Sequence, residues 1–275
     1  MMLGQTILAR AMSGMRSGKH GEQFQYNSRS DHHSKVACWT LLFDAVRECD
    51  VIEKHARSGL LGFGINYEMV GPINKTLDMV LTRVPSTREA VHRTTFVDLA
   101  KRWNIPLEEK ELAWLSGFGN FVHDDAADDL EVVLALEAKA CMTAHVKALP
   151  RLHAEILATG FLAKRSTPRC IVVSYTLINS AETFLPSGEG EPKRHKQPQD
   201  AQRVLDMLAN AIPLSRDHNN LVGYDVVGAS ILRAPNDGTP VHIDTKLAWP
   251  ERSDHIRYER MIRSLCSEYR ARASG

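Results

Sequence analysis

The nine residues Glu131–Lys139, EVVLALEAK, decide the fold because they read as a buried strand that ends in two charges. Side chains alternate across a strand, so Glu137 and Lys139 point to the same face. The opposite face is then filled by apolar side chains, namely Val132, Leu134, Leu136 and Ala138. A carboxylate and an amine therefore lie together at the tip of a strand that is otherwise apolar.

A second apolar strand is predicted upstream, at residues 76–83 (TLDMVLTR), and it contains one acid, Asp78. Two carboxylates a few ångströms apart bind a hard cation such as Mg2+, so Asp78 and Glu137 are the candidate metal ligands. Such an ion supports hydrolysis of a phosphodiester bond. The Lys139 ammonium stabilises the charge of the transition state or, with a lowered pKa, helps to deprotonate the attacking water.

Asp78, Glu137 and Lys139 together resemble the motif of the PD-(D/E)xK nuclease superfamily, which has the restriction-endonuclease-like fold. The resemblance covers roughly residues 35–180. Two features depart from the pattern: the nearest upstream proline is Pro72, and the two acids are 59 residues apart in the chain. Residues 86–129 between them are therefore expected to form a helical insertion.

The resemblance implies a Mg2+-dependent endonuclease that hydrolyses DNA, with Mn2+ as the alternative ion and Asp78, Glu137 and Lys139 as the catalytic residues. Restriction or anti-phage defence is the expected role, and DNA repair or phage DNA processing is the alternative. Glu68 ends the strand that precedes Asp78, so it is either a further ligand in the catalytic site or plain hairpin polarity. In nucleases that this region resembles, the helix after the acid-x-lysine strand runs beside the scissile phosphate.

The formal net charge is only +1, so DNA contacts must come from local clusters of basic residues rather than from bulk attraction. The expected contacts lie on the helix after Lys139 and in a polar loop, namely Lys147, Arg151, Lys193, Arg194 and Lys196. His145 also lies in that helix and is either near the phosphate or simply exposed. Solvated surface is the alternative for the loop, in which case the C-terminal arginines or a second subunit build the groove.

Two other classes of function stay open. A catalytically inert DNA-binding or scaffold protein would keep the fold without needing the three charged residues. A metal-dependent hydrolase on another fold would use His32 and His33 with the acidic segment 124–129, although neither histidine belongs to an H-x-x-x-H or H-x-E spacing. The aspartates of that acidic segment are also the candidates to replace Asp78 as a ligand.

The predicted fold class is α/β: a mixed central sheet flanked by helices, with a restriction-endonuclease-like core and a helical insertion. Residues 1–34 are expected to form an arm of uncertain order, residues 35–275 a single nuclease domain, and residues 187–199 a flexible loop. Helices are predicted at 34–49, 143–159, 200–212 and 253–272, with Gly160 stopping the second. Strands are predicted at 60–68, 76–84, 131–139, 169–177 and 222–232.

The five cysteines are scattered, with no C-x-x-C pair, so they are expected to be reduced and mostly buried. No apolar run approaches the ~20 residues that span a bilayer, and no signal peptide is recognisable. The sequence therefore predicts a cytoplasmic protein with DNA, and no membrane, as its partner. Because cutting both strands of a duplex commonly needs two sites, a homodimer is an expectation as well.

Overall fold

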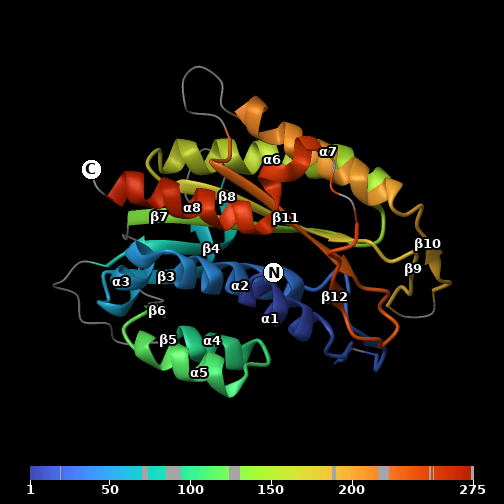
Figure 1. Cartoon of the computed structure of the whole chain (residues 1–275), viewed down its shortest axis with the longest axis horizontal. Coiled ribbons are helices and arrows are strands. Elements are labelled where there is room, and N and C mark those ends of the chain that lie inside the picture. The colour runs from blue at the N-terminus through green and yellow to red at the C-terminus, as the bar shows by residue number, and fades with distance from the viewer. Residues whose placement is uncertain are drawn as a thin grey trace.

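The fold is α/β, as predicted: a large mixed sheet lies between helices (Figure 1). The computed structural model describes residues 1–18, 20–69, 74–84, 94–123, 131–187, 190–215, 223–247, 249 and 251–273. Within these residues the strand order is β12-β11-β8-β7-β4-β3-β6-β5. The mixed sheet is confirmed, while a restriction-endonuclease-like core stays a prediction.

Five longer strands form the middle of the sheet: β3 (Leu61–Met69), β4 (Lys75–Arg83), β7 (Glu131–Cys141), β8 (Ile171–Asn179) and β11 (Val226–Arg233). Strands β3, β4 and β7 pair antiparallel, whereas β7, β8 and β11 run parallel. The edges are short: β12 (His242–Ile243) on one side, and β6 (Val122–His123) and β5 (Thr94–Thr95) on the other. The carboxyl ends of the parallel strands therefore meet at one edge of the sheet, where Glu137 and Lys139 approach the end of β7.

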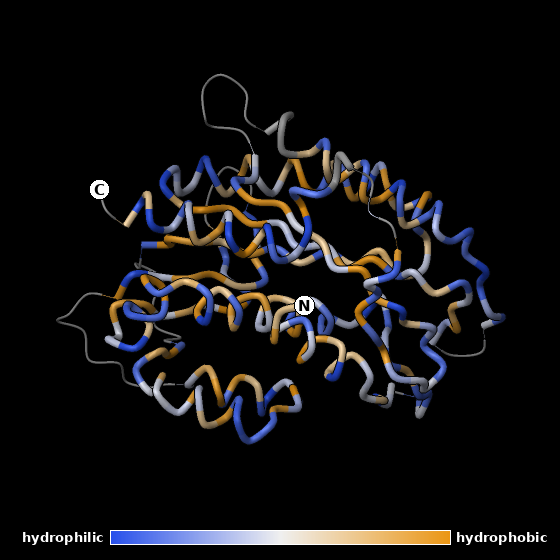
Figure 2. The backbone as a smooth tube through the Cα atoms, viewed as in Figure 1, coloured by the Kyte–Doolittle hydropathy of each residue, from blue (hydrophilic) through white to orange (hydrophobic). Residues whose placement is uncertain are grey.

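Helices cover both faces, and each face has its own apolar core. One face packs against α1 (Leu3–Met12), α2 (His32–Glu48), α3 (Asp50–Arg57) and α8 (Tyr258–Ala273). The other packs against α6 (His145–Ser166) and α7 (Gln199–Ser215). The strands between them are the most hydrophobic part of the chain, as Figure 2 shows. A sheet covered on both faces explains why all nine residues of β8 are buried.

The insertion between β4 and β7 holds two short helices, α4 (Phe96–Arg102) and α5 (Glu109–Leu115), and a 3-10 turn at Ser116–Phe118. The pair lies below α1 and α2 in Figure 1. Its apolar side chains join the α1–α2 core, where Trp39 stacks on Phe96. The described residues of the insertion are therefore mainly helical, but β5 and β6 at its two ends join the sheet, which the sequence did not predict.

The N-terminal segment is packed rather than an arm. Helix α1 buries Ile7 and Leu8 completely, and the α2 carboxylate Asp44 accepts the backbone N–H of Gly4. A small hairpin, β1 (Arg16–Ser17) with β2 (Gln23–Phe24), follows it. The predicted loop 187–199 also contains structure, because β10 (Lys193–Arg194) pairs with β9 (Thr183–Phe184).

Two local predictions were wrong. Val132 faces the α6–α7 core, with Ala135, because the β4–β7 register shifts between Leu81 and Thr82. Gly160 does not stop the helix that precedes β8: α6 continues to Ser166. A Cβ at Gly160 would lie 2.8 Å from the Gly223 backbone, so glycine at this position allows α6 to pack closely against that backbone.

The expectation that every cysteine is reduced was also wrong. Cys49, between α2 and α3, forms a disulfide with Cys266 in α8, with their Cα atoms 5.5 Å apart. The remaining cysteines are free and buried. Pairing across 217 residues depends on the tertiary packing of α8 against α2 and α3, which no local spacing reveals.

Among the described residues, none of the helices combines the length and apolar composition that a membrane-spanning segment requires.

Candidate active site

The three residues of the predicted motif meet where β4 separates from β7. The paired register of these strands ends at Met79 and Leu136. Beyond that point the backbone N–H of Ala138 donates to Asp78 Oδ2 at 2.9 Å. The Asp78 carboxylate thus takes the hydrogen bond that a neighbouring strand would otherwise accept, which fixes it beside the Glu137–Lys139 strand end.

The neighbouring strand β3 is irregular at the same level. Asn66, between the pairs Ile65–Met79 and Tyr67–Leu77, has a φ of +49°, in the left-handed region that asparagine tolerates better than most residues. Residues before Asn66 pack against the α2 side, whereas those after it pack against the α6 side. In both strands of the hairpin, the alternation of side chains between the two cores is therefore shifted at this point. Asp78 lies between the two cores rather than within one.

Glu137 is almost fully buried, and its two oxygens have different surroundings. Oε1 accepts from two ammonium groups, Lys139 Nζ at 2.6 Å and Lys75 Nζ at 3.0 Å. Oε2 is buried and has no hydrogen-bond partner among the described residues. A buried carboxylate oxygen without a donor is costly, so this atom is suited to accept a ligand.

The electrostatics of the site favour a bound cation. Burial, and then the charge of Glu137, raise the pKa of Asp78 to about 6 from its ordinary 3.8. Burial acts to lower the pKa of Lys139, but the Glu137 and Glu155 carboxylates outweigh it and raise the pKa. Lys139 is therefore a charge-stabilising ammonium in this state rather than a base, and the two acids repel each other.

The first turn of α2 closes the site from one side. The Ser34 side chain lies against Asp78 and lowers the pKa of that carboxyl, against the larger effect of burial. His33 is half-buried and packs against Tyr26, and this burial lowers its pKa to about 4. His32 lies 3.2 Å from Arg16, and its pKa also falls to about 4 through burial. The sequence suggested both histidines only for a hydrolase on another fold and had no signal for their position in the first turn of α2 beside Ser34.

Helix α6 closes the other side through a chain of charges. Glu155 lies 3.5 Å from Lys139 Nζ and accepts from Arg151 Nε at 2.6 Å. Arg151 and Lys147 are both exposed. Glu155 therefore links Arg151 to Lys139, while substrate binding by Arg151 and Lys147 stays a prediction.

The predicted basic loop is held near the start of α6 by two histidines. His145 donates from Nε2 to the Asn179 carbonyl at 2.7 Å, and its ring packs edge-on against His195 at 4.7 Å. His195 in turn bonds the Ala181 carbonyl. The exposed side chains that flank His195 therefore lie at the carboxyl edge of the sheet: Lys193, Arg194 and Lys196. His145 itself is buried and does not face solvent.

Other predicted residues lie elsewhere. Glu68 is exposed and accepts from Asn74 at 2.9 Å, at the end of the hairpin where β3 connects to β4, rather than bonding to Asp78 or Glu137. The acidic segment 124–129 lies outside the described residues. Lys75, which sequence reasoning missed, reaches Glu137 only because β4 and β7 pair antiparallel.

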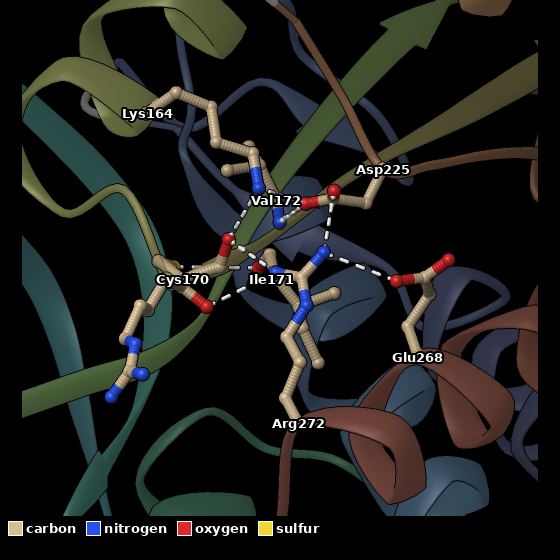
Figure 3. Close-up of polar contacts among 8 residues, drawn as sticks. Lys164, Cys170, Ile171, Val172, Asp225, Glu268 and Arg272 are labelled. Carbon is tan, nitrogen blue, oxygen red and sulfur yellow. Dashed lines mark hydrogen bonds and ion pairs between the residues drawn. The ribbon is translucent and has the colours of Figure 1, made fainter. Parts of the chain in front are cut away.

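A second charged cluster, at the opposite edge of the sheet, shows what a purely structural site looks like (Figure 3). Asp225 Oδ1 pairs with Arg272 at 2.7 Å, while Oδ2 accepts from Val172 N at 2.8 Å and lies 2.6 Å from Lys164 Nζ. Arg272 also bonds Glu268 and the Cys170 carbonyl. Every oxygen of Asp225 is satisfied, in contrast to Glu137 Oε2.

The residues present fit a Mg2+ ion that keeps most of its water. Among the described residues, no set of three or more His, Cys, Asp or Glu side chains is arranged to hold a metal. Mg2+ is commonly bound by one or two carboxylates, with water and substrate phosphate as its other ligands. Asp78 and the free Oε2 of Glu137 provide such a pair.

Comparisons with protein-family models, curated proteins and solved structures gave no match to this chain. Only the geometry of the site therefore bears on function.

Proposed function

We propose that this protein is a Mg2+-dependent endonuclease that hydrolyses DNA phosphodiester bonds. One observation carries the proposal: a buried oxygen of Glu137 without a donor lies beside a strand break that holds Asp78, with Lys139 on the same carboxylate. An acid with a perturbed pKa, here Asp78, beside a lysine and an unsatisfied polar atom is typical of functional sites. A role in restriction or anti-phage defence stays a prediction.

Each residue has a distinct part in this reaction. Asp78 and Glu137 would hold the ion, which supplies neutralisation of phosphate charge and activation of water. Lys139, kept protonated by its carboxylate neighbours, stabilises the charge that develops on the phosphoryl oxygens. Glu155 holds Lys139 from α6, and Arg151 is exposed beside Glu155, where it can bind a neighbouring phosphate.

One observation favours a second candidate, an inert nucleic-acid-binding or scaffold protein. The two lysines on Glu137 balance the charges of Asp78 and Glu137 without any metal. A structural cluster with balanced charges needs no ion. The unsatisfied Oε2 counts against this alternative, since the structural cluster around Asp225 leaves no such atom.

A plasmid cleavage assay separates the two candidates. The wild-type protein is expected to nick or cut supercoiled plasmid with Mg2+ and to stop when EDTA is added. Glu137→Gln and Lys139→Ala are each expected to slow cleavage by about 100-fold or more, because each removes a group that stabilises charge. Glu131→Gln, at the exposed opposite end of the same strand, is the matched control and should cleave normally.

The proposal fails if a pure, folded wild-type protein does not cleave DNA with Mg2+ or Mn2+. It also fails if Lys139→Ala cleaves at the wild-type rate, because the assigned site would then be uninvolved.

A further inference from the structure

Two lysines share one oxygen of Glu137, and they are anchored differently. Lys139 is also close to Glu155, whereas Glu137 is the only carboxylate paired with Lys75 in the described part of the chain. Lys75 is the longer contact, at 3.0 Å against 2.6 Å, and the more exposed side chain, at 28% against 17%. Lys75 is therefore the ammonium that can leave more easily.

Charge balance indicates when it would leave. Asp78 and Glu137 carry two negative charges, which Lys75 and Lys139 neutralise. A divalent cation entering beside Glu137 adds two positive charges to a site that is already neutral. Repulsion then acts on both lysines, but Lys139 is retained by Glu155.

The position of Lys75 indicates where it would go. It is the first residue of β4, at the carboxyl edge of the parallel strands, where the described basic side chains of α6 and β10 are exposed. A lysine ammonium on a flexible stem binds phosphate as a point charge and needs no fixed orientation.

Resting on the proposed function, we propose that Lys75 is a displaceable counter-ion. It occupies Glu137 in the metal-free protein, leaves when a divalent cation binds, and then binds a non-bridging phosphate oxygen of the nucleic-acid strand. Lys75 thereby couples cation binding to substrate binding: the metal frees the ammonium, and the phosphate receives it.

The first test measures Mn2+ binding without nucleic acid, from the electron paramagnetic resonance signal of free Mn2+. Lys75→Met and Lys75→Gln are expected to bind Mn2+ about tenfold more tightly than wild type, because a competing positive charge has been removed. Lys75→Arg keeps the charge and should bind near the wild-type affinity. Lys101→Met, which removes an exposed lysine from α4, should change nothing.

The second test measures binding of a short DNA duplex with Ca2+ by fluorescence anisotropy over a range of KCl concentrations. Lys75→Met should bind more weakly and flatten the log–log salt slope by about one unit, whereas Lys101→Met should not. Tighter Mn2+ binding and weaker DNA binding in one variant is a combination that loss of structure would not produce.

The outcomes distinguish this inference from the proposed function. If wild type cleaves DNA but Lys75→Met binds Mn2+ no more tightly, or binds DNA with an unchanged slope, Lys75 is a fixed structural partner and the inference is overturned. If neither protein binds Mn2+, both proposals are overturned.

Discussion

We predict that the buried Asp78 carboxylate lowers the free energy of unfolding of the protein above pH 6. Its pKa is raised from 3.8 to about 6, because burial and the neighbouring Glu137 oppose its ionisation. A raised pKa in a folded acid means that ionisation costs more in the folded chain than in the unfolded one. The difference corresponds to about 3 kcal/mol once the pH is above both values. We therefore expect Asp78→Asn to stabilise the fold near pH 8 by up to about 3 kcal/mol.

The pH dependence has a definite sign. Below pH 4 Asp78 is protonated in both the folded and the unfolded chain, so the substitution has little effect. Between pH 4 and 6 the unfolded wild-type chain loses its proton first, and the free energy of unfolding of wild type falls relative to that of the variant. Asparagine can still accept the Ala138 N–H bond, so the local backbone pairing is retained.

Urea denaturation at pH 8, 6 and 4.5, followed by tryptophan fluorescence, measures the effect. Asp44→Asn is the matched control, since burial also raises the pKa of Asp44 to about 6, far from the site. Both variants should gain stability at pH 8 and keep only about 1 kcal/mol of that gain at pH 4.5. Mg2+ should stabilise wild type and Asp44→Asn, by about 2.7 kcal/mol at a hundred times its Kd, but not Asp78→Asn. An Asp78→Asn protein that is less stable than wild type at pH 8, or whose gain is constant with pH, would refute the reasoning.

The remaining predictions concern substrate binding and the two long-range links of the fold. Neutralising the three exposed basic side chains of β10 and its loop should weaken DNA binding. It should also flatten the log–log dependence of binding on salt, by up to about one unit per lost phosphate contact. An unchanged slope in anisotropy titrations would mean that the loop is solvated and does not contact DNA. These side chains are Lys193, Arg194 and Lys196. Asp225→Asn should lower the free energy of unfolding by about 3 to 5 kcal/mol, since it leaves the buried Lys164 ammonium without its carboxylate partner; a loss under 1 kcal/mol in urea would contradict this. Reducing the disulfide between Cys49 and Cys266 should lower stability by roughly 4 to 5 kcal/mol, given the length of the loop it closes; an unchanged urea midpoint with dithiothreitol would count against it.

Strong local periodicity predicted most of the sheet and its larger helices. The strands β3, β4, β7 and β8 and the helices α2 and α7 each occur within a few residues of their predicted ranges. Their sequences carry long apolar runs whose period fits a single element, so propensity and burial agree. Helix α1 was missed as a packed element because its Ile7 and Leu8 have no partner in the nearby sequence. They are buried only once α2 is in place.

The residues of the candidate site also differ in whether the sequence could predict their contacts. Glu137 and Lys139 could be paired from the alternation of one strand, because two residues of separation decide their face. Lys75 could not be found in this way, since its contact with Glu137 follows from the antiparallel pairing of β4 with β7. The hydrogen bond from Ala138 to Asp78 depends on where that pairing stops, which sequence periodicity does not encode.

The two charged clusters differ in how fully the oxygens of their central carboxylates, Asp225 and Glu137, are hydrogen-bonded. Around Asp225, Lys164 and Arg272 satisfy both carboxylate oxygens, and the cluster ties α6 and α8 to the sheet. Around Glu137, two lysines crowd one oxygen and leave the other without a donor. If β7 carried a purely structural ion pair, redistributing one lysine to Oε2 would relieve both the crowding and the unsatisfied atom at little cost. The arrangement instead leaves Oε2 without a donor in the site that also contains Asp78, and under the proposed function a divalent cation would take both carboxylates as ligands and release Lys75 for phosphate.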